Sequence, residues 1–71
     1  MDPELLVPIG AALAVGLAAI STALAQARIG AAGAGLIAER PEMAGTVILL
    51  IAIPETMVIL GFAVAAMILF L

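Results

Sequence analysis

The sequence of 71 residues contains no cysteine, histidine, tryptophan or tyrosine. Without cysteine there is no disulfide framework and no thiol chemistry, and the usual nitrogen and sulfur ligands of metal sites are missing as well. Only 3% of the residues are aromatic, so the chain has no platform on which nucleic-acid bases could stack. These absences exclude many classes of metal-binding, redox and nucleic-acid-binding protein.

Charge is also scarce. Charged residues make up 10% of the chain, the net charge is -3, and the only cations are Arg28 and Arg40. Such a chain has no basic patch, so we expect no nucleic acid among its partners. Hydrophobic residues make up 68% of the chain and the mean hydropathy is +1.48, which leaves too little polar surface for a water-soluble globule. The composition predicts a membrane protein with lipid as its solvent.

Two stretches are long enough to cross a bilayer, which takes about 20 apolar residues per helix. The stretch 5–27 carries no charge, and in the stretch 43–71 Glu55 is the only charge. We therefore predict one all-α domain over residues 1–71, with a helix over about 5–38, a loop over about 39–42 and a helix over about 43–71. Acidic Asp2 and Glu4 argue against a signal peptide, so we expect a chain that is mature from Met1.

A sharp turn separates the two predicted helices. Pro41 cannot donate a backbone hydrogen bond and disfavours helical angles at Arg40, so the first helix should end there. The result is an antiparallel hairpin of two transmembrane helices. Because both arginines lie toward the loop, the positive-inside rule places the hairpin in the cell membrane with its loop in the cytoplasm and both termini outside.

One stripe of the first helix, at alternating steps of four and three, consists of small residues except for Gln26. Its residues are Ala12, Gly16, Ala19, Ala23, Gln26, Gly30 and Gly33, and six of the seven are glycine or alanine. A stripe rotated by one residue carries Ile9, Leu13, Leu17, Ile20 and Leu24. Small residues at this spacing let membrane helices approach closely, although the high alanine and glycine content makes other stripes look similar. In so short a chain, a helix that can pack closely against others along its whole length predicts a homo-oligomer of many copies.

Glu55 is an acid inside the apolar run "LLIAIPETMVILGF". A charged carboxylate at the centre of a membrane helix costs on the order of 2.5 to 3.5 kcal/mol, so hydrocarbon favours its protonated or cation-bound form. Glu55 is therefore a candidate carrier that is neutral when loaded and charged when empty. The alternative is an acid that only bonds to a neighbouring helix.

Gln26 lies at the same level as Glu55 in the predicted hairpin, because it stands as far before Arg40 as Glu55 stands after Pro41. At ~1.5 Å per residue, each lies roughly 21 Å from the turn. The Gln26 amide can donate to a carboxylate, and its oxygen can bind a hard cation. We expect the two side chains to meet, with the hydroxyl of Thr56 beside them.

Each of these residues also has a purely structural interpretation. Gln26 can bridge two helices, the Thr56 hydroxyl can bond back to its own helix, and Pro54 can act only as a kink. Arg28 can pair with a glutamate of a neighbouring copy or extend toward the cytoplasmic interface.

The segments "AQARIGAAGAGLIAERPEMAG" and "IPETMVILGF" resemble the proteolipid, or rotor-ring, subunits of rotary ATPases, most of all the c/K subunits of the A-type (V/A-type) enzymes. The resemblance covers essentially the whole chain. It implies a homo-oligomeric ring of identical hairpins in lipid, with the first helix inside. Ions would enter and leave through half-channels of a static membrane subunit, and central-stalk subunits would bind the loop. The chain itself would be a non-catalytic subunit without a catalytic residue or a cofactor.

The same resemblance assigns the ion-binding residues. Glu55 takes the position of the family's carrier acid, with Gln26, Thr56 and the backbone carbonyl of Ile53 around it. The carried ion would be H+, or Na+ bound by Glu55, Gln26 and Thr56. Sodium-binding relatives often have a glutamine at the position of Met57, and a thioether is a poor ligand for a hard cation, so we expect protons.

Two other classes of protein remain open. A small oligomeric pore former of the holin type would also have two spans, and a structural membrane adaptor would explain the small-residue stripe. Neither gives a reason for an acid and an amide at the same depth.

Overall fold

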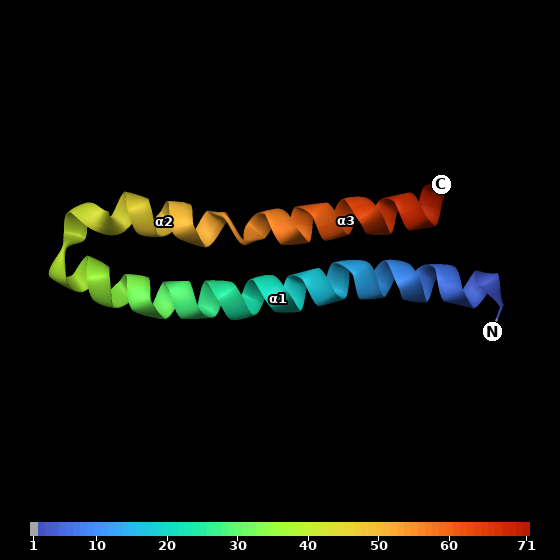
Figure 1. Ribbon diagram of the computed structural model, residues 1–71, viewed down its shortest axis with the longest axis horizontal. Helices are drawn as coiled ribbons and strands as arrows, with labels where there is room; N and C mark the ends of the chain where they lie inside the picture. The colour runs from blue at the N-terminus through green and yellow to red at the C-terminus, as the bar shows by residue number, and fades with distance from the viewer. Residues whose placement is uncertain (1) are drawn as a thin grey trace.

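Two antiparallel helical rods form a hairpin 55 Å long in the computed structural model, which describes residues 2–71 (Figure 1). The first rod is α1 (Pro3–Glu39). The second consists of the short 3-10 helix η1 (Pro41–Met43), α2 (Ala44–Ala52) and α3 (Glu55–Phe70). The start and the end of the chain lie together at one end of the hairpin, and the connection lies at the other. The predicted all-α hairpin is thereby confirmed.

Prolines set both ends of α1. Asp2 has extended backbone angles and Pro3 occupies the first helical position, where its missing N–H is not needed. At the other end Arg40 leaves the helical region, with φ -136° and ψ 84°, and its N–H donates to the Leu36 carbonyl at 2.7 Å. Pro41 then opens η1, as expected for a residue that forces its predecessor out of a helix.

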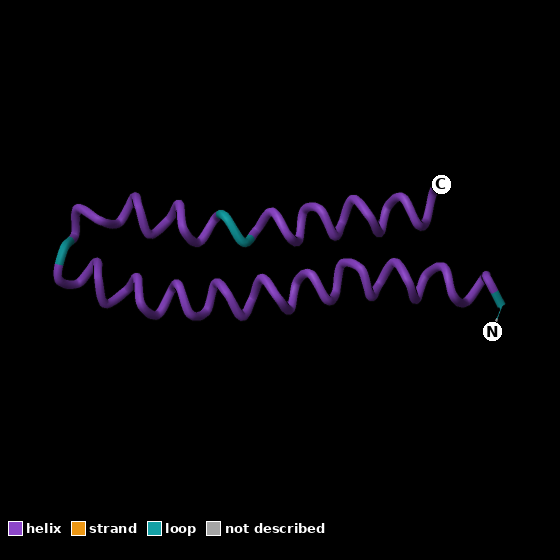
Figure 2. The backbone as a smooth tube through the Cα atoms, in the orientation of Figure 1, coloured by secondary structure: helices purple, strands orange, loops and turns teal. Residues whose placement is uncertain are grey.

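The second rod is interrupted in its middle, at residues 53–54 (Figure 2). The cause is Pro54, which has no N–H to offer the Leu50 carbonyl. Tighter bonds replace the helical ones: Thr56 N–H donates to the Ile53 carbonyl and Met57 N–H to the Pro54 carbonyl, each at 3.1 Å. The sequence predicts one helix over about 43–71, whereas the structure divides this range into the end of η1, α2 and α3. The break lies directly before Glu55.

Small residues make the contact between the rods. The buried residues among those described are Ala11, Thr22, Gly33, Val47 and Ala65. At Gly33 an added Cβ atom would collide with the side chain of Val47, and at Gly61 it would lie 2.7 Å from the Cβ atom of Ala18. The two rods therefore approach closely at two points because glycine occupies them.

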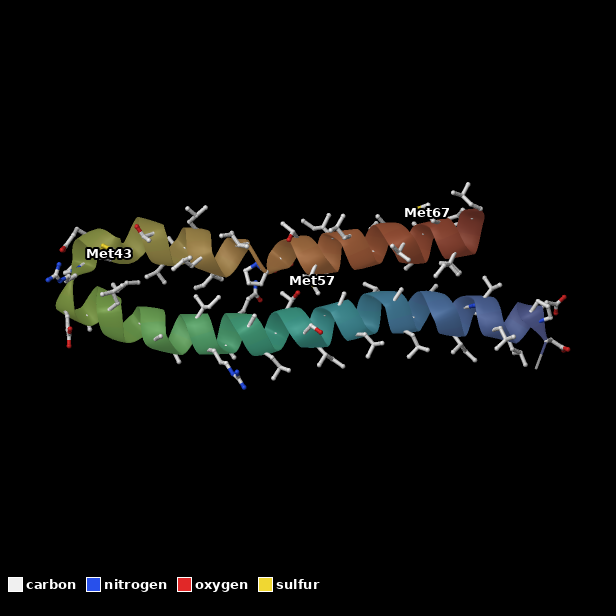
Figure 3. All side chains as sticks on the ribbon, viewed as in Figure 1. Met43, Met57 and Met67 are labelled. Carbon is white, nitrogen blue, oxygen red and sulfur yellow. The ribbon has the colours of Figure 1, made fainter. Side chains whose placement is uncertain are left out.

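Most of the large apolar side chains are exposed, and most sticks along both rods carry only carbon (Figure 3). Leu17 and Leu24 are each 60% exposed, and Phe62 is 65% exposed. Both rods are long and apolar enough to cross a membrane, at Pro3–Glu39 and Pro41–Phe70, and in their most apolar windows only 11% and 6% of the residues are buried. A soluble core helix would be mostly buried, so these surfaces suit lipid or further copies of the chain.

The small-residue stripe of α1 does not coincide with the contact between the rods. Gly33 is buried against Val47, but Ala12, Ala19 and Ala23 are exposed. The first half of the stripe is therefore available to another molecule.

Candidate functional site

The side chains of Gln26 and Glu55 meet between the two rods. Nε2 of Gln26 donates a hydrogen bond of 2.8 Å to Oε2 of Glu55. The first residue comes from the middle of α1, and the second is the first residue of α3. Their contact agrees with the equal distance from the turn that the sequence spacing predicts.

Gln26 also holds the backbone just before the helix break. The same Nε2 atom donates to the carbonyl of Ile51 at 3.1 Å. One amide group thus contacts both the last turn of α2 and the acid at the start of α3. Both of its N–H bonds are used, which leaves its oxygen, Oε1, as the free polar atom of the side chain.

Thr22 makes a third polar contact, which was not predicted from the sequence. Its hydroxyl donates to the Pro54 carbonyl at 2.8 Å, and its side chain is only 3% exposed. A signal was present in the sequence, because Thr22 and Gln26 are four residues apart and share one face of a helix. Two side chains of α1 therefore hold the break in the second rod, one on each side of Ile53.

Thr56 and Ile53, the other two predicted site residues, contact each other. The Thr56 hydroxyl donates to the Ile53 carbonyl at 2.8 Å, and the Thr56 N–H donates to the same carbonyl. A bond back to its own helix is the structural alternative that the sequence leaves open for Thr56. Within the described hairpin, the hydroxyl is thus not bonded to Glu55.

The site opens on the side of the hairpin. Glu55 and Thr56 are exposed, and Gln26 is half-buried. Among residues 2–71 there is no cluster of three acidic, histidine or cysteine side chains that could hold a metal ion by itself. A single hairpin therefore offers one carboxylate, supported by an amide, on a surface that a neighbouring molecule or lipid must cover.

Fold and site together define a two-span membrane subunit whose one mid-span acid is bonded to an amide of the other span. The chain matches the family model of the ATP synthase C subunit over residues 9–68, and it belongs to this family. The resemblance noted from the sequence is thereby confirmed, and so is the expectation of a membrane protein.

Its relatives include three archaeal proteins named A-type ATP synthase subunit K. The chain is 44% identical over 70 residues to that of Methanocaldococcus jannaschii, an alignment that covers 99% of this chain and 32% of the relative. It is 45% identical over 62 residues to that of Sulfolobus acidocaldarius and 44% over 62 residues to that of Sulfurisphaera tokodaii, with 87% of this chain and 61% of the relative covered in each case. The chain thus spans about a third of the first relative and about three fifths of the other two.

Proposed function

We propose that this chain is a rotor-ring subunit of a membrane rotary ATP synthase or ATPase, and that Glu55 binds and releases one ion as the ring turns. Membership of the family of ATP synthase C subunits and the names of the three relatives support the assignment. The observation that carries the role of Glu55 is its 2.8 Å hydrogen bond to Gln26, in the middle of a two-span hairpin.

Assembly into a ring of identical copies is part of this proposal. The family is known for oligomeric rings. In this chain Ala12, Ala19 and Ala23 are exposed on α1, and their small side chains allow another helix to pack closely against it. The surface that lipid or neighbouring copies must cover is large, because so little of either span is buried within the hairpin.

The proposed cycle depends on the charge of one carboxyl group. In contact with lipid Glu55 must be neutral, since a bare carboxylate is costly there. Opposite a polar path in a static membrane subunit it can ionise and exchange its ion. Gln26 donates to Oε2 of Glu55, so the other carboxyl oxygen is the one that holds a carried proton. The hydrogen bond from the Gln26 amide keeps the side chain of Glu55 against α1 in both the neutral and the charged state.

The membrane potential then supplies the driving force. Each elementary charge that crosses 100 mV is worth about 2.3 kcal/mol, so several carriers must pass for each ATP made or hydrolysed. Many identical hairpins, each with one acid, meet that requirement. The chain serves as the moving ion carrier and leaves nucleotide chemistry to other subunits.

A proton is the ion that fits this chain best. The position after Thr56 holds the thioether of Met57, a poor ligand for a hard cation. Protonation needs only the carboxyl group and its amide partner. Na+, bound by Glu55, Gln26 and Thr56, is the alternative, and chemical modification of Glu55 distinguishes the two ions.

The partners and the orientation belong to the same proposal. A static membrane subunit supplies the two half-channels, and central-stalk subunits bind the loop. The protein lies in the cell membrane with its loop in the cytoplasm and both termini outside. The positions of Arg28 and Arg40, on the loop half of the hairpin, support this orientation.

Replacement of the acid tests the function. In membranes that contain the whole enzyme, Glu55→Gln should abolish ATP-driven ion pumping, since the amide can neither bind nor release a proton. The matched control is Glu4→Gln, which makes the same chemical change at an exposed residue in the first turn of α1, away from the loop. Pumping that survives in Glu55→Gln would show that this residue is not the carrier.

Chemical modification identifies the ion. A hydrophobic carbodiimide should label Glu55 in wild-type membranes, because the reagent reacts with protonated carboxyl groups in lipid. Labelling that is the same with and without Na+ at neutral pH supports protons. Protection by Na+ would replace the proton with sodium in this proposal, and a lack of labelling at every pH would contradict a neutral carrier state.

A further inference from the structure

Arg28 is a cation on the membrane-spanning helix α1 that the proposed function does not use. It is exposed, and its side chain forms no hydrogen bond or ion pair with other residues in the described part of the chain. Its place in α1 is ~18 Å from the turn, close to the level of Gln26 and Glu55. An unpaired arginine inside a membrane is costly, so it needs acceptors from outside the hairpin.

Arg28 and Gln26 lie on opposite sides of the hairpin. Each residue advances an α-helix by about 100°, so two residues separate their directions by about 200°. Gln26 points along the side of α1 where it reaches Glu55. We call the side with Gln26 and Glu55 the Gln26 flank, and the opposite side of the hairpin the Arg28 flank.

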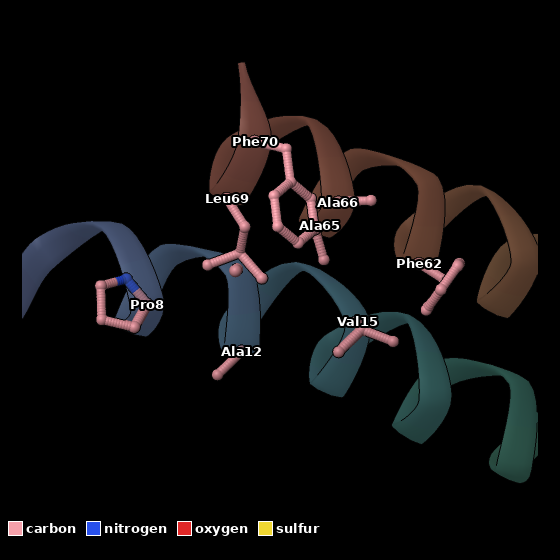
Figure 4. A pocket seen from close by; sticks show the side chains of 9 residues that line it. Pro8, Ala12, Val15, Phe62, Ala65, Ala66, Leu69 and Phe70 are labelled. Carbon is pink, nitrogen blue, oxygen red and sulfur yellow. The ribbon is translucent and has the colours of Figure 1, made fainter.

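The Gln26 flank continues into an apolar groove of about 380 Å³ between α1 and α3 (Figure 4). Pro8 lines this groove and lies about five full helical turns before Gln26, so both residues point the same way. Phe62, also in the lining, is about two turns beyond Glu55. One uncovered surface therefore runs from the groove to the polar pair.

A second copy of the chain fits this surface. In a cyclic assembly one flank of each copy meets the opposite flank of the next, and two different flanks are what such a head-to-tail contact requires. The two flanks are complementary in hydrogen bonding: one carries an arginine that lacks acceptors, and the other carries the amide and the acid at nearly the same level. The groove beside them is apolar, as is most of the chain.

One free acceptor on the Gln26 flank is the amide oxygen of Gln26, and the other is the second carboxyl oxygen of Glu55. Its Nε2 atom already donates to Ile51 and Glu55, while Oε1 has no partner among residues 2–71. Copies related by an axis parallel to the helices keep the same depth, so Arg28 of one copy is offset from Gln26 of the next by ~3 Å along the axis. A guanidinium group on a long side chain spans that offset and brings five N–H donors.

We propose that Arg28 of each copy donates a hydrogen bond to Oε1 of Gln26 in the adjacent copy. This inference rests on the ring assembly put forward under the proposed function. The bond gives the arginine an acceptor and fixes which end of the amide faces Glu55. Gln26 is a better partner than Glu55 itself, because a permanent ion pair would keep the acid charged and prevent its neutral state in lipid.

Double substitution tests the bond itself. Arg28→Leu and Gln26→Leu, alone and together, are compared by the temperature or detergent concentration at which purified rings dissociate. If the two residues bond across copies, each single change weakens the ring, and the double change costs clearly less than the sum of the two. An average hydrogen bond between membrane helices corresponds to about threefold in the association constant at each contact.

Three further variants make the outcome specific. Arg28→Lys should restore part of the stability, since it keeps a charged donor, whereas Arg40→Gln, which removes the same charge in the loop, should leave ring stability unchanged. Glu55→Gln combined with Arg28→Leu should give additive losses. Additive losses for Arg28 with Gln26, or coupling to Glu55 instead, would overturn the inference.

Cross-linking tests the arrangement of the flanks without altering Arg28 or Gln26. Ser21 and Ala23 are exposed and, like Arg28 and Gln26, two residues apart, so they face opposite flanks. The natural chain has no cysteine. Oxidation of a Ser21→Cys, Ala23→Cys double variant should give a ladder of linked copies, and each single variant should not.

The results separate the two proposals. If wild-type rings cannot be isolated and no ladder forms, the ring itself is wrong. If rings and the ladder form but Arg28 and Gln26 are not coupled, the ring stands and the bond between copies is wrong.

Discussion

Thr22 and Gln26 hold the second span through carbonyl groups that flank Ile53. Their donors reach the Pro54 and Ile51 carbonyls at 2.8 and 3.1 Å, while one further bond from Gln26 reaches Glu55. These are the three side-chain hydrogen bonds between the rods in the described chain. Because hydrogen bonds are directional, these three bonds determine how α1 is rotated against the break.

Removal of the Thr22 hydroxyl should therefore loosen the hairpin. Thr22→Val keeps the shape but leaves the Pro54 carbonyl without this donor. We expect a loss of about 0.6 kcal/mol, the average for hydrogen bonds between membrane helices, and at most about 1.7 kcal/mol. The measurement is unfolding by SDS in mixed micelles, followed by circular dichroism. Thr22→Ser should retain most of the stability, and Ser21→Ala, on an exposed neighbour, should change little.

Depth along a helix can be predicted from a sequence more easily than rotation about its axis. The spacing from the turn predicts the meeting of Gln26 and Glu55, which the hydrogen bond of 2.8 Å confirms. It does not show that Thr22 points into the same contact, because a threonine in a helix often bonds back to its own backbone. Thr56 does so in this structure, while Thr22 does not.

Glu55 lies directly after the break between α2 and α3. Pro54 denies the Leu50 carbonyl its helical partner, and the chain resumes helical structure at Glu55. The sequence identifies Pro54 as a place of local loosening. It does not predict how the hydrogen bonds rearrange there, because a proline in a membrane helix can be accommodated in several ways. In the structure Ile53 and Pro54 keep helical backbone angles, and the bonds of Thr56 and Met57 shift to the carbonyls three residues before them.

Pro54→Ala should close this break. The restored N–H can donate to the Leu50 carbonyl, so α2 and α3 should join into one helix. The carbonyls of Ile51 and Pro54 would then turn away from Gln26 and Thr22. Hydrogen exchange measured by NMR in micelles should show slower exchange for residues 54–58, together with weaker ion pumping in the whole enzyme.

Pro8→Ala is the matched control, since it restores an N–H near the start of α1, far from the site. Unchanged exchange at residues 54–58 in Pro54→Ala would contradict the view that this proline creates the break.

Gly61 sets the distance between α1 and α3. A Cβ atom there would lie 2.7 Å from the Cβ atom of Ala18 and 3.1 Å from the Ala14 carbonyl oxygen, so a side chain must push the helices apart. We expect Gly61→Leu to destabilise the hairpin by about 1 to 3 kcal/mol, as overpacking usually does. The same SDS titration measures it.

The control for this change is Gly45→Leu, because an added Cβ atom at Gly45 meets nothing within 4 Å. Equal losses for the two variants would mean that the cost comes from the exchanged glycine alone and not from the contact with Ala18.

At the scale of the whole molecule, most of the apolar surface of the hairpin is available to lipid or to other protein chains. Its buried residues are few and small, while leucine, isoleucine and phenylalanine side chains line its outer surface. The sequence predicts the hairpin well, because apolar length and one prolyl turn leave few alternatives. It predicts less about the two flanks, since the small-residue stripe of α1 only partly meets the second rod: Gly33 is buried there and Ala23 is exposed.

The orientation of the hairpin is a property of the whole molecule and can be tested with single cysteines in a chain that has none. Glu42 lies in η1, directly after the turn, and Leu71 follows the last residue of α3; both are exposed. A membrane-impermeant maleimide should label Glu42→Cys only in inverted vesicles and Leu71→Cys only in right-side-out vesicles, because arginines near the loop retain it in the cytoplasm. Ala23→Cys, in mid-span, should stay unlabelled in both, and the opposite pattern at positions 42 and 71 would reverse the proposed topology.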